Sequence, residues 1–153
     1  MNAVLIPRNR TEGKMINILF LCVANSARSQ MAEGIGRVLL ADIAHTKSAG
    51  SQPSQVNPLA IEVLKEIGID ISHHKSKSID SIDKEKIDIV ITLCAEEVCP
   101  IFLGNVKRLH WPLPDPSNSK YSSDEQLKLF REVRDDLKNK IQALRDEAKL
   151  WKR

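Results

Sequence analysis

The first strong pattern along the chain is a run of apolar residues at Ile16–Leu21 that no charged residue interrupts. A short and nearly all-apolar run is typical of a strand that is buried on both faces of a parallel sheet. A loop of small and polar residues follows at Cys22–Arg28. Apolar residues then recur at helical spacing as far as about Asp42, namely at Met31, Ile35, Val38 and Leu39. The pattern therefore predicts a strand, a loop and a helix in this order.

Three further segments have the composition of strands. His45–Ala49 suits a short strand, Ile87–Cys94 is a β-branched run, and Val106–Trp111 is a weaker one that precedes turn-forming residues. Together with the first run, these segments predict four strands that are separated by helices or loops.

Helix start signals mark two more helices. Asn57 and Pro58 predict the start of one, because Asn caps free amides and Pro fits the first helical position, and Gly68 marks its end. The segment Ser122–Glu125 has the pattern of a capping box. A long amphipathic helix is predicted after it from the spacing of Leu127, Phe130, Val133, Leu137, Ile141, Leu144 and Ala148.

The alternation of strands and helices predicts a parallel sheet with right-handed crossovers. The expected fold class is therefore α/β, a four-stranded parallel sheet with helices on both faces. In such sheets, ligands bind at the carboxyl ends of the strands. Cys22 follows the first predicted strand, Cys94 ends the third, and Asp115 follows the fourth. We therefore expect these three side chains to meet at one edge of the sheet.

Length and charge set limits on the class of protein. The 153 residues suit one compact domain, which we expect at residues 15–153, with residues 1–14 as a flexible N-terminal extension. The net charge of +3 arises from interleaved charges of both signs, which tolerates an anionic substrate but gives little support for nucleic-acid binding. Neither a membrane-spanning run nor the long apolar core of a signal peptide is apparent. We therefore expect a cytoplasmic protein with no nucleic-acid or membrane partner.

The loop after the first strand is the main candidate site. Such a loop points backbone amides inward, and the N-terminus of the following helix adds partial positive charge, so the two together bind a tetrahedral oxyanion. The same field favours the thiolate form of a cysteine, and the planar fork of an arginine can hold two oxygens of the anion. The alternative is a core cysteine that has an arginine nearby by chance. The candidate loop residues are Cys22, Val23, Ala24, Asn25, Ser26, Ala27, Arg28 and Ser29.

Two residues of this loop have more specific expected roles. Ser29 can donate a hydrogen bond to the Cys22 thiolate, and Asn25 tolerates the left-handed backbone conformation that a tight loop needs. Ala24 would reshape the loop if its position needed a positive φ, which favours glycine.

The motifs "CVANSARS" and "LPDP" resemble those of the low-molecular-weight protein tyrosine phosphatase family, and more closely those of its arsenate reductase branch. The resemblance covers roughly residues 15–150. It implies that Cys22 is the nucleophile, that the Cys22–Arg28 loop binds the oxyanion, and that Asp115 is the general acid. Without the resemblance, Asp115 would be an ordinary turn aspartate before proline.

Three positions favour the reductase branch over the phosphatases. Phosphatases of this family usually have an aromatic residue just after the Asp-Pro pair, where this chain has Ser117. Their second loop cysteine, just before the arginine, is replaced by Ala27. Reductases that resemble this chain carry a redox pair after the third strand, and "TLCAEEVCP" places Cys94 and Cys99 there. The odd count of three cysteines also differs from a secreted disulfide scaffold.

The resemblance implies an arsenate reductase that works through a disulfide relay. Reduction of arsenate takes two electrons, and formation of one disulfide supplies two. Cys22 would attack arsenic, Cys94 would attack Cys22, and Cys99 would attack Cys94, with no metal or organic cofactor. Phosphate and sulfate are expected to compete with arsenate. The reductant is expected to be thioredoxin or, because the Cys94–Cys99 spacing is short, glutaredoxin with a small thiol.

Other functions stay open from the sequence. The chain could be a low-molecular-weight phosphatase or a non-catalytic oxyanion-binding regulatory module. Cys94 and Cys99 could form a zinc site with His73, His74 or His110, although a matching second pair of ligands is missing. The expectation for His73 and His74 is a solvated loop pair. Glu33 and Ser48 could help to hold a cation behind the loop, or have a surface or capping role.

Overall fold

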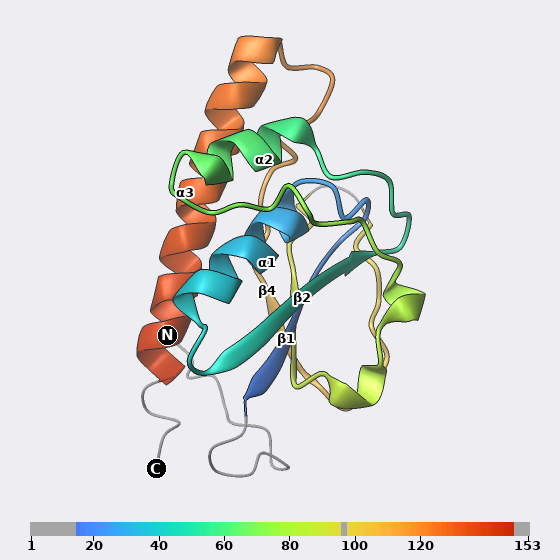
Figure 1. The fold of residues 1–153 in the computed structure, drawn as a ribbon. Coiled ribbons are helices and arrows are strands. Elements are labelled where there is room, and N and C mark those ends of the chain that lie inside the picture. Colours follow the sequence, from blue (N-terminus) through green and yellow to red (C-terminus); the bar gives the residue numbers. More distant parts are fainter. Residues whose placement is uncertain (1–14, 96–97, 149–153) are drawn as a thin grey trace.

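The structure, a computed structural model, describes residues 15–95 and 98–148. The predicted extension at residues 1–14 lies outside the described residues, as do the last residues of the predicted domain, 149–153. Four strands form one sheet in the order β2-β1-β3-β4, and every neighbouring pair is parallel (Figure 1). The strands are β1 (Ile16–Cys22), β2 (Ala44–Gly50), β3 (Ile89–Thr92) and β4 (Lys107–His110). The predicted four-stranded parallel sheet is therefore confirmed.

The helices begin where the sequence places their caps. The side chain of Asn57 accepts a hydrogen bond from the Leu59 amide at 2.8 Å, just before α2. Ser122 and Glu125 form the predicted capping box, in which each backbone amide donates to the other residue's side chain at 3.1 and 3.2 Å. Gly68, with φ of +79°, follows the end of α2. The α-helices are α1 (Arg28–Leu39), α2 (Pro58–Lys65) and α3 (Ser123–Ala148).

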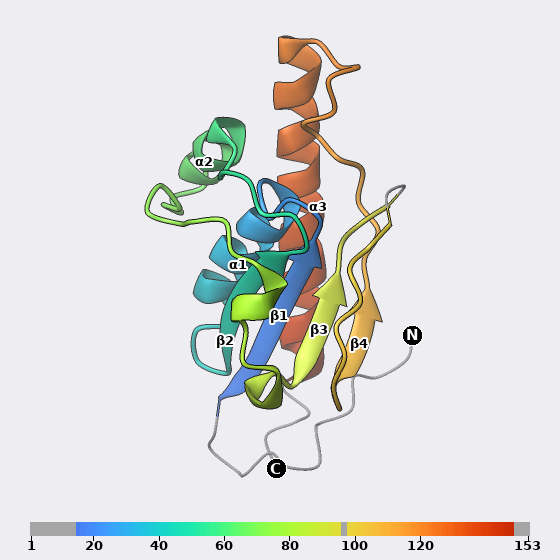
Figure 2. The ribbon, with the colours of Figure 1, turned by 90° about the vertical axis from the view of Figure 1, so that its right-hand side faces the viewer.

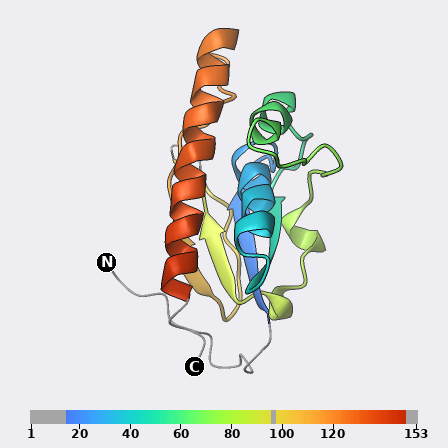
Figure 3. The ribbon, with the colours of Figure 1, turned by 60° about the vertical axis from the view of Figure 1, so that its left-hand side comes forward.

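The two faces of the sheet are covered unequally. All three α-helices share one hydrophobic core with the face of β1 that carries Ile16, Ile18 and Phe20. Figure 3 shows α1 and α3 side by side on this face. The opposite face carries Leu19 and Leu21, which share a second apolar cluster with Ile79 of the 3₁₀ helix η1 (Ile79–Ser81) and with Phe102. A further 3₁₀ helix, η2 (Lys84–Lys86), precedes β3, and Figure 2 shows η1 and residues 98–106 on this side of the sheet.

Helices thus lie on both faces, as expected, but the α-helices cover one face and only short 3₁₀ segments and irregular chain cover the other. The long apolar stripes of the α-helices need a wide apolar surface, whereas the short polar segments between residues 78 and 88 bury only Ile79, Ile82 and Ile87 against the sheet. None of the helices in the described ranges has the length and apolar character needed to span a bilayer.

The strand register brings the carboxyl ends of the strands together. Cys22 at the end of β1 pairs with Gly50 of β2, and Leu21 pairs with Thr92 of β3, which pairs with His110 of β4. The loops that follow β1, β3 and β4 therefore start at the same edge of the sheet, where the sequence predicted a site.

Candidate active site

The loop Cys22–Ser29, called the oxyanion loop below, has its carbonyl groups turned away from the site. The backbone amides of residues 52, 54 and 57 donate to the carbonyl oxygens of Val23, Ala24 and Ser26 at 2.9, 3.1 and 2.9 Å. In a trans peptide the N–H group points opposite to the C=O group. The amides that follow these carbonyls therefore point to the other side of the loop, where an anion can accept from them.

The N-terminus of α1 adds positive charge to the same place. The helix begins at Arg28, its N-cap residue Ala27 supplies no side-chain cap, and its first turn holds no acidic residue. Its first N–H groups and the positive end of the helix dipole therefore face the oxyanion loop without a carboxylate of the same turn beside them. This arrangement favours an anionic ligand, as the sequence predicted.

Hydrogen bonds orient the Cys22 sulfur. Cys22 is buried, and its Sγ lies 2.8 Å from the Oγ of Ser29. The Nδ2 of Asn25 donates to the same Oγ at 2.7 Å. Since the Ser29 hydroxyl accepts from Asn25, its proton is free to point at the sulfur and stabilise a thiolate. Asn25 has φ of +49°, which confirms the left-handed conformation expected of it.

Asn25 is held in this conformation by residues that the sequence analysis did not single out. Its Oδ1 accepts from the Lys77 backbone N–H at 2.8 Å and from Gln30 Nε2 at 2.9 Å. Its carbonyl oxygen accepts from Ser76 Oγ at 2.7 Å. Asn25 is fully buried, so these bonds satisfy polar groups that water cannot reach. No local sequence signal marks Ser76 and Lys77, because they lie about fifty residues from Asn25.

Gly50 is a second site residue that the sequence did not reveal. A Cβ atom at this position would lie 2.3 Å from the Val23 carbonyl oxygen and 2.9 Å from the Asn25 nitrogen. Any side chain would therefore push the oxyanion loop away from the end of β2. The loop is thus packed directly against the sheet edge.

The predicted residues Cys22, Arg28 and Asp115 meet in one small pocket. Arg28 is buried, and its Nη1 donates to the Leu113 carbonyl at 3.1 Å, which fixes the guanidinium beside the loop. Asp115 Oδ1 accepts from the backbone N–H and the hydroxyl of Ser117 at 3.0 and 2.7 Å. The pocket has a volume of about 30 Å³ and is lined by Cys22, Ala24, Ser26, Ala27, Arg28, Asp115 and Ser117.

The strand register places Cys94 at the same edge of the sheet as Cys22. Leu21 pairs with Thr92, and the Leu93 backbone N–H donates to the Leu21 carbonyl at 3.0 Å. Leu93 therefore lies beside Cys22, and Cys94 is the next residue along the chain. Adjacent strands are about 4.8 Å apart. Cys94 is buried and is joined to Cys99 in a disulfide whose Cα atoms are 5.5 Å apart, while Cys22 is a free thiol. The two cysteines after β3 thus form a redox pair one strand away from Cys22.

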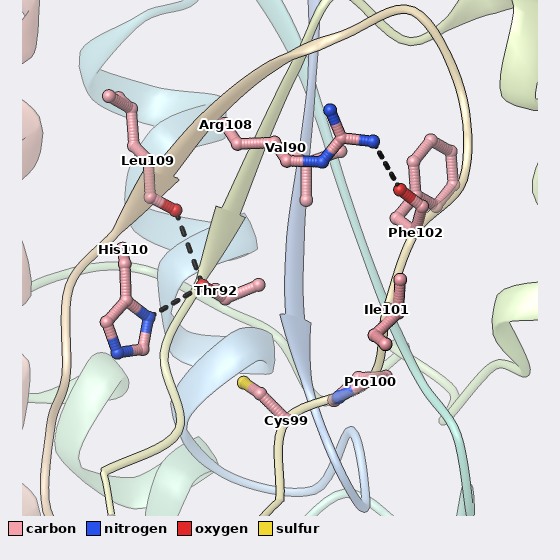
Figure 4. A pocket seen from close by; sticks show the side chains of 9 residues that line it. All are labelled: Val90, Thr92, Cys99, Pro100, Ile101, Phe102, Arg108, Leu109 and His110. Atoms are coloured by element: carbon pink, nitrogen blue, oxygen red, sulfur yellow. Dashed lines mark hydrogen bonds between the residues drawn. The ribbon is translucent and has the colours of Figure 1, made fainter.

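A groove opens beside Cys99 on the face of the sheet opposite the α-helices. It has a volume of about 330 Å³, and Figure 4 shows Cys99, Pro100 and Ile101 facing Thr92 and His110 across it. Cys99 is half-buried, whereas Cys94 is buried. The outer sulfur of the disulfide is therefore the one that an external molecule can reach. Large apolar side chains of the same segment are exposed to solvent: Val98, Ile101 and Leu103.

Two alternatives from the sequence are not supported. Among the described residues no group of three His, Cys, Asp or Glu side chains could hold a metal ion, and Cys94 and Cys99 are bonded to each other in a disulfide. Ala24 needs no positive φ, since Asn25 is the one non-glycine residue with positive φ in the described part of the chain. The backbone conformation at this position therefore does not require glycine.

His74 differs from its expected role as a solvated loop residue. Its side chain is only 4% exposed, and its Nδ1 lies 2.9 Å from Gln30 Oε1 while its Nε2 lies 2.7 Å from Arg37 Nη1. An amide oxygen can only accept, so Nδ1 carries the proton and Nε2 accepts from the arginine, which makes the ring neutral. Burial lowers the pKa of His74 from its ordinary value of 6.5, and the Glu33 carboxylate opposes part of this shift. His73 is exposed, as expected.

Comparison with known proteins agrees with this fold. Residues 17–153 match the family described as low molecular weight phosphotyrosine protein phosphatase. An arsenate reductase of Halalkalibacterium halodurans is 43% identical over 134 residues, which span 86% of this chain and 96% of the relative. The chain belongs to the low molecular weight phosphotyrosine protein phosphatase family.

Solved structures place the chain near one group within that family. A structure described as an arsenate reductase in the phosphate binding state has a TM-score of 0.72 and 35% sequence identity, and the match covers 88% of this chain and 98% of that one. A thioredoxin-dependent arsenate reductase of Corynebacterium glutamicum has a TM-score of 0.67 and 26% identity, with 89% of this chain and 63% of that one covered. The resemblance stated from the motifs is thus confirmed over nearly the whole chain.

Proposed function

We propose that this protein is an arsenate reductase that converts arsenate to arsenite through Cys22 and a disulfide relay. The observation that carries the proposal is the pairing of a buried free cysteine in an oxyanion loop with a separate redox pair, Cys94 and Cys99, one strand away. A phosphatase needs the first feature alone. The names of the relatives, which are arsenate reductases, support the same reaction.

In the first step, the Cys22 thiolate attacks arsenic in the oxyanion loop. A sulfur–arsenic bond forms, one arsenic–oxygen bond breaks, and the departing oxygen takes a proton from Asp115 and leaves as water. The loop amides and Arg28 bind the remaining oxygens and stabilise their charge. Asp115 lines the same pocket as Cys22, which is the placement that a general acid needs.

In the second step, the Cys94 thiolate attacks the Cys22 sulfur. The sulfur–sulfur bond forms as the sulfur–arsenic bond breaks, and its electron pair passes to arsenic, which leaves as arsenite. In the third step, Cys99 attacks Cys94 and releases Cys22 as a thiolate. The disulfide then joins Cys94 and Cys99, the arrangement in which these three cysteines are found in this structure.

We propose that a dithiol reductant completes the cycle at Cys99. Its thiolate attacks the half-buried Cys99 sulfur beside the groove of Figure 4, and its second thiol resolves the mixed disulfide. The exposed apolar residues Val98 and Ile101 suit contact with a protein such as thioredoxin, and a solved relative is thioredoxin-dependent. Glutaredoxin with a small thiol is the alternative. We place the reaction in the cytoplasm, where such reductants keep thiols reduced.

Phosphatase activity is the second candidate function, because Cys22, Arg28 and Asp115 are enough to hydrolyse a phosphate ester. One observation weighs against it as the main activity. The residue after the Asp-Pro pair is Ser117, whose hydroxyl donates to Asp115, so this position offers no aromatic ring to stack on a substrate. We therefore expect weak hydrolysis of small aryl phosphates beside arsenate reduction.

The proposal is tested by steady-state assays with the wild-type protein. Arsenate should be reduced in the presence of thioredoxin, thioredoxin reductase and NADPH, with phosphate and sulfate as competitive inhibitors. An aryl phosphate should be hydrolysed much more slowly. Efficient hydrolysis of the aryl phosphate without arsenate reduction by either thioredoxin or glutaredoxin would make the phosphatase reading correct. Binding of oxyanions without turnover of either substrate would instead support the third alternative, a non-catalytic regulatory module.

A further inference from the structure

We propose that Lys77 is a built-in cation that positions the oxyanion loop, and that it makes anion binding independent of dissolved monovalent cations. Lys77 is thus a positioning residue, since it acts through Glu33 and Asn25. The inference rests on the oxyanion-binding role proposed above for the loop.

Lys77 lies behind the loop against a largely buried carboxylate. Glu33, on α1, is 14% exposed, and its Oε1 accepts from the Ser48 hydroxyl at 2.7 Å and from Lys77 Nζ at 3.3 Å. Lys77 Nζ also donates to the Lys75 carbonyl at 3.3 Å. The ammonium group thus has oxygen ligands from Glu33 and Lys75, the kind of site in which a dissolved cation would bind. Glu33 and Ser48, considered from the sequence as ligands of a cation, instead meet a lysine.

The positive charge at Glu33 comes from Lys77 and not from His74. Among the described residues, the ion pairs of Glu33 are with these two side chains, and His74 Nδ1 lies 3.5 Å from Oε2. The hydrogen bonds of His74 to Gln30 and Arg37 make the ring neutral, as derived above. A partly buried carboxylate without a cation is costly, so Glu33 depends on Lys77 for its neutralisation.

The backbone of Lys77 connects this ion pair to the nucleophile. Its N–H group donates to Asn25 Oδ1 at 2.8 Å, Asn25 Nδ2 donates to Ser29 Oγ, and Ser29 Oγ lies 2.8 Å from Cys22 Sγ. The carbonyl of Lys77 also accepts from the Gly50 amide at 2.9 Å at the end of β2. The ion pair with Glu33 therefore fixes residue 77 at both its side chain and its backbone. Loss of the ion pair frees the segment that holds Asn25 in place.

Removal of the ammonium group should make the protein respond to small cations. In Lys77→Met the Glu33 carboxylate keeps its hydrogen bond from the Ser48 hydroxyl but loses its positive partner, so it attracts a cation from solution. Potassium is small enough to bind beside Glu33 at the place that the ammonium group leaves, whereas choline is not. The wild-type protein should be indifferent to this exchange, because Lys77 already occupies the place.

The experiment measures the affinity for inorganic phosphate by calorimetry in choline chloride and in potassium chloride at equal ionic strength. The wild-type protein and Lys77→Arg should bind phosphate equally in both salts. Lys77→Met should bind about three- to tenfold more weakly in choline chloride and recover at least half of the loss in potassium chloride. Lys47→Met is the matched control, because it removes an exposed lysine next to Ser48 and lowers the net charge equally. Lys47→Met should behave as wild type.

A second readout is the rate of Cys22 alkylation by iodoacetamide across pH, which follows the thiolate directly. In Lys77→Met the pH dependence of this rate should differ from that of the wild type, and potassium should restore the wild-type pH dependence. A general loss of stability would not produce this restoration. Circular dichroism and Lys77→Gln distinguish misfolding from the proposed effect, because Lys77→Gln should show the same response to potassium.

Several results would overturn the inference. They are unchanged phosphate affinity in Lys77→Met in choline chloride, a loss that potassium does not restore, an equal loss in Lys47→Met, or a wild-type protein that itself needs potassium. In these cases the wild type still binds phosphate, so the oxyanion loop stands and only the role of Lys77 fails. Absence of phosphate binding in the wild type would instead overturn both this inference and the proposed function.

Discussion

The oxyanion loop and the segment that carries Cys99 lie at the same edge of the sheet but are built in opposite ways. In the loop, Asn25 is fully buried and its side chain and carbonyl take part in hydrogen bonds to four other residues. Described residues 98–106 form neither helix nor strand, and Val98 is 92% exposed. The loop is fixed to the sheet and to residues 75–77, whereas the other segment lies against the sheet mainly through Phe102.

The two steps of the proposed chemistry have different needs, which this difference matches. Binding of a tetrahedral anion requires donors that are already in place, because their reorganisation during the reaction would raise the barrier. Disulfide exchange requires that the disulfide pass from Cys22 and Cys94 to Cys94 and Cys99, and that an external thiol then reach the Cys99 sulfur, so part of the segment has to be accessible. Variants in the loop should therefore change anion chemistry, and variants in the segment should change only electron transfer.

The largest expected effect separates the two regions completely. In Cys94→Ser no thiol can attack Cys22, so thioredoxin-linked arsenate reduction should fall by about 10³-fold or more. Hydrolysis of an aryl phosphate through Cys22 should be retained, because Cys94 takes no part in it. Both activities are measured on the same preparation. Full thioredoxin-linked activity in this variant would show that Cys94 is not needed for electron transfer.

Asp115→Asn should affect both activities and leave anion binding largely intact. The asparagine keeps the shape of the side chain and an acceptor for Ser117, but it cannot donate a proton to a departing oxygen. The chemical step should slow by about 10²- to 10⁴-fold, with the aryl phosphate affected most because its leaving group needs the proton. Rapid-quench kinetics measures the step, and phosphate calorimetry serves as the control. If Asp115→Asn has wild-type rates on both substrates, Asp115 is not the general acid and has only a structural role in the turn.

Arg28→Lys should weaken oxyanion binding more than the conserved charge suggests. The planar guanidinium holds two oxygens and donates to the Leu113 carbonyl, and an ammonium group cannot do both. We expect phosphate and sulfate affinity to fall by about 10- to 100-fold. The spacing of Cys94 and Cys99 is untouched, so thiol oxidation by a chemical oxidant should proceed as in the wild type. Equal phosphate affinity would count against the loop as the binding site.

The smallest expected effect concerns stability and pH. Burial lowers the pKa of His74 below its ordinary value of 6.5, so the unfolded chain takes up a proton at a pH where the folded chain does not. The free energy of unfolding should therefore fall as pH drops below about 6.5, by at most about 1.4 kcal/mol per pH unit for one proton. His74→Gln, which can still contact Gln30, should flatten this slope. Urea titrations between pH 5 and 8 measure it; identical slopes in both proteins would show that His74 is not buried in its neutral form.

The sheet, the helix starts and the reactive residues could be predicted because their signals are local. The run at Ile16–Leu21 predicted β1, and Asn57 and Ser122 predicted two helix caps that the structure shows. Cys22 and Arg28 are only six residues apart, on either side of a strand-to-helix loop. Such patterns follow from the backbone geometry of single elements.

The parts that could not be predicted depend on contacts between distant residues. His74 and Lys77 look like members of a polar loop, and their burial follows only from the approach of residues 74–77 to α1 and Asn25. The need for glycine at position 50 comes from the closeness of the Val23 carbonyl, which no local pattern records. The unequal covering of the two sheet faces likewise depends on how the segments between the strands pack, which is not a local property. Contacts between distant residues are therefore the part of the structure that local sequence patterns do not predict.

The central claim, that three cysteines act in turn, is tested most directly by one turnover without an external reductant. Fully reduced protein is mixed with arsenate, quenched, alkylated and digested, and the disulfides are mapped by mass spectrometry beside a measurement of arsenite. The wild type should yield one arsenite per chain, with Cys22 free and Cys94 joined to Cys99. Cys99→Ser should also yield one arsenite, but stall with Cys22 joined to Cys94. Three reduced thiols beside a full equivalent of arsenite, in a wild type that turns over arsenate, would contradict the relay.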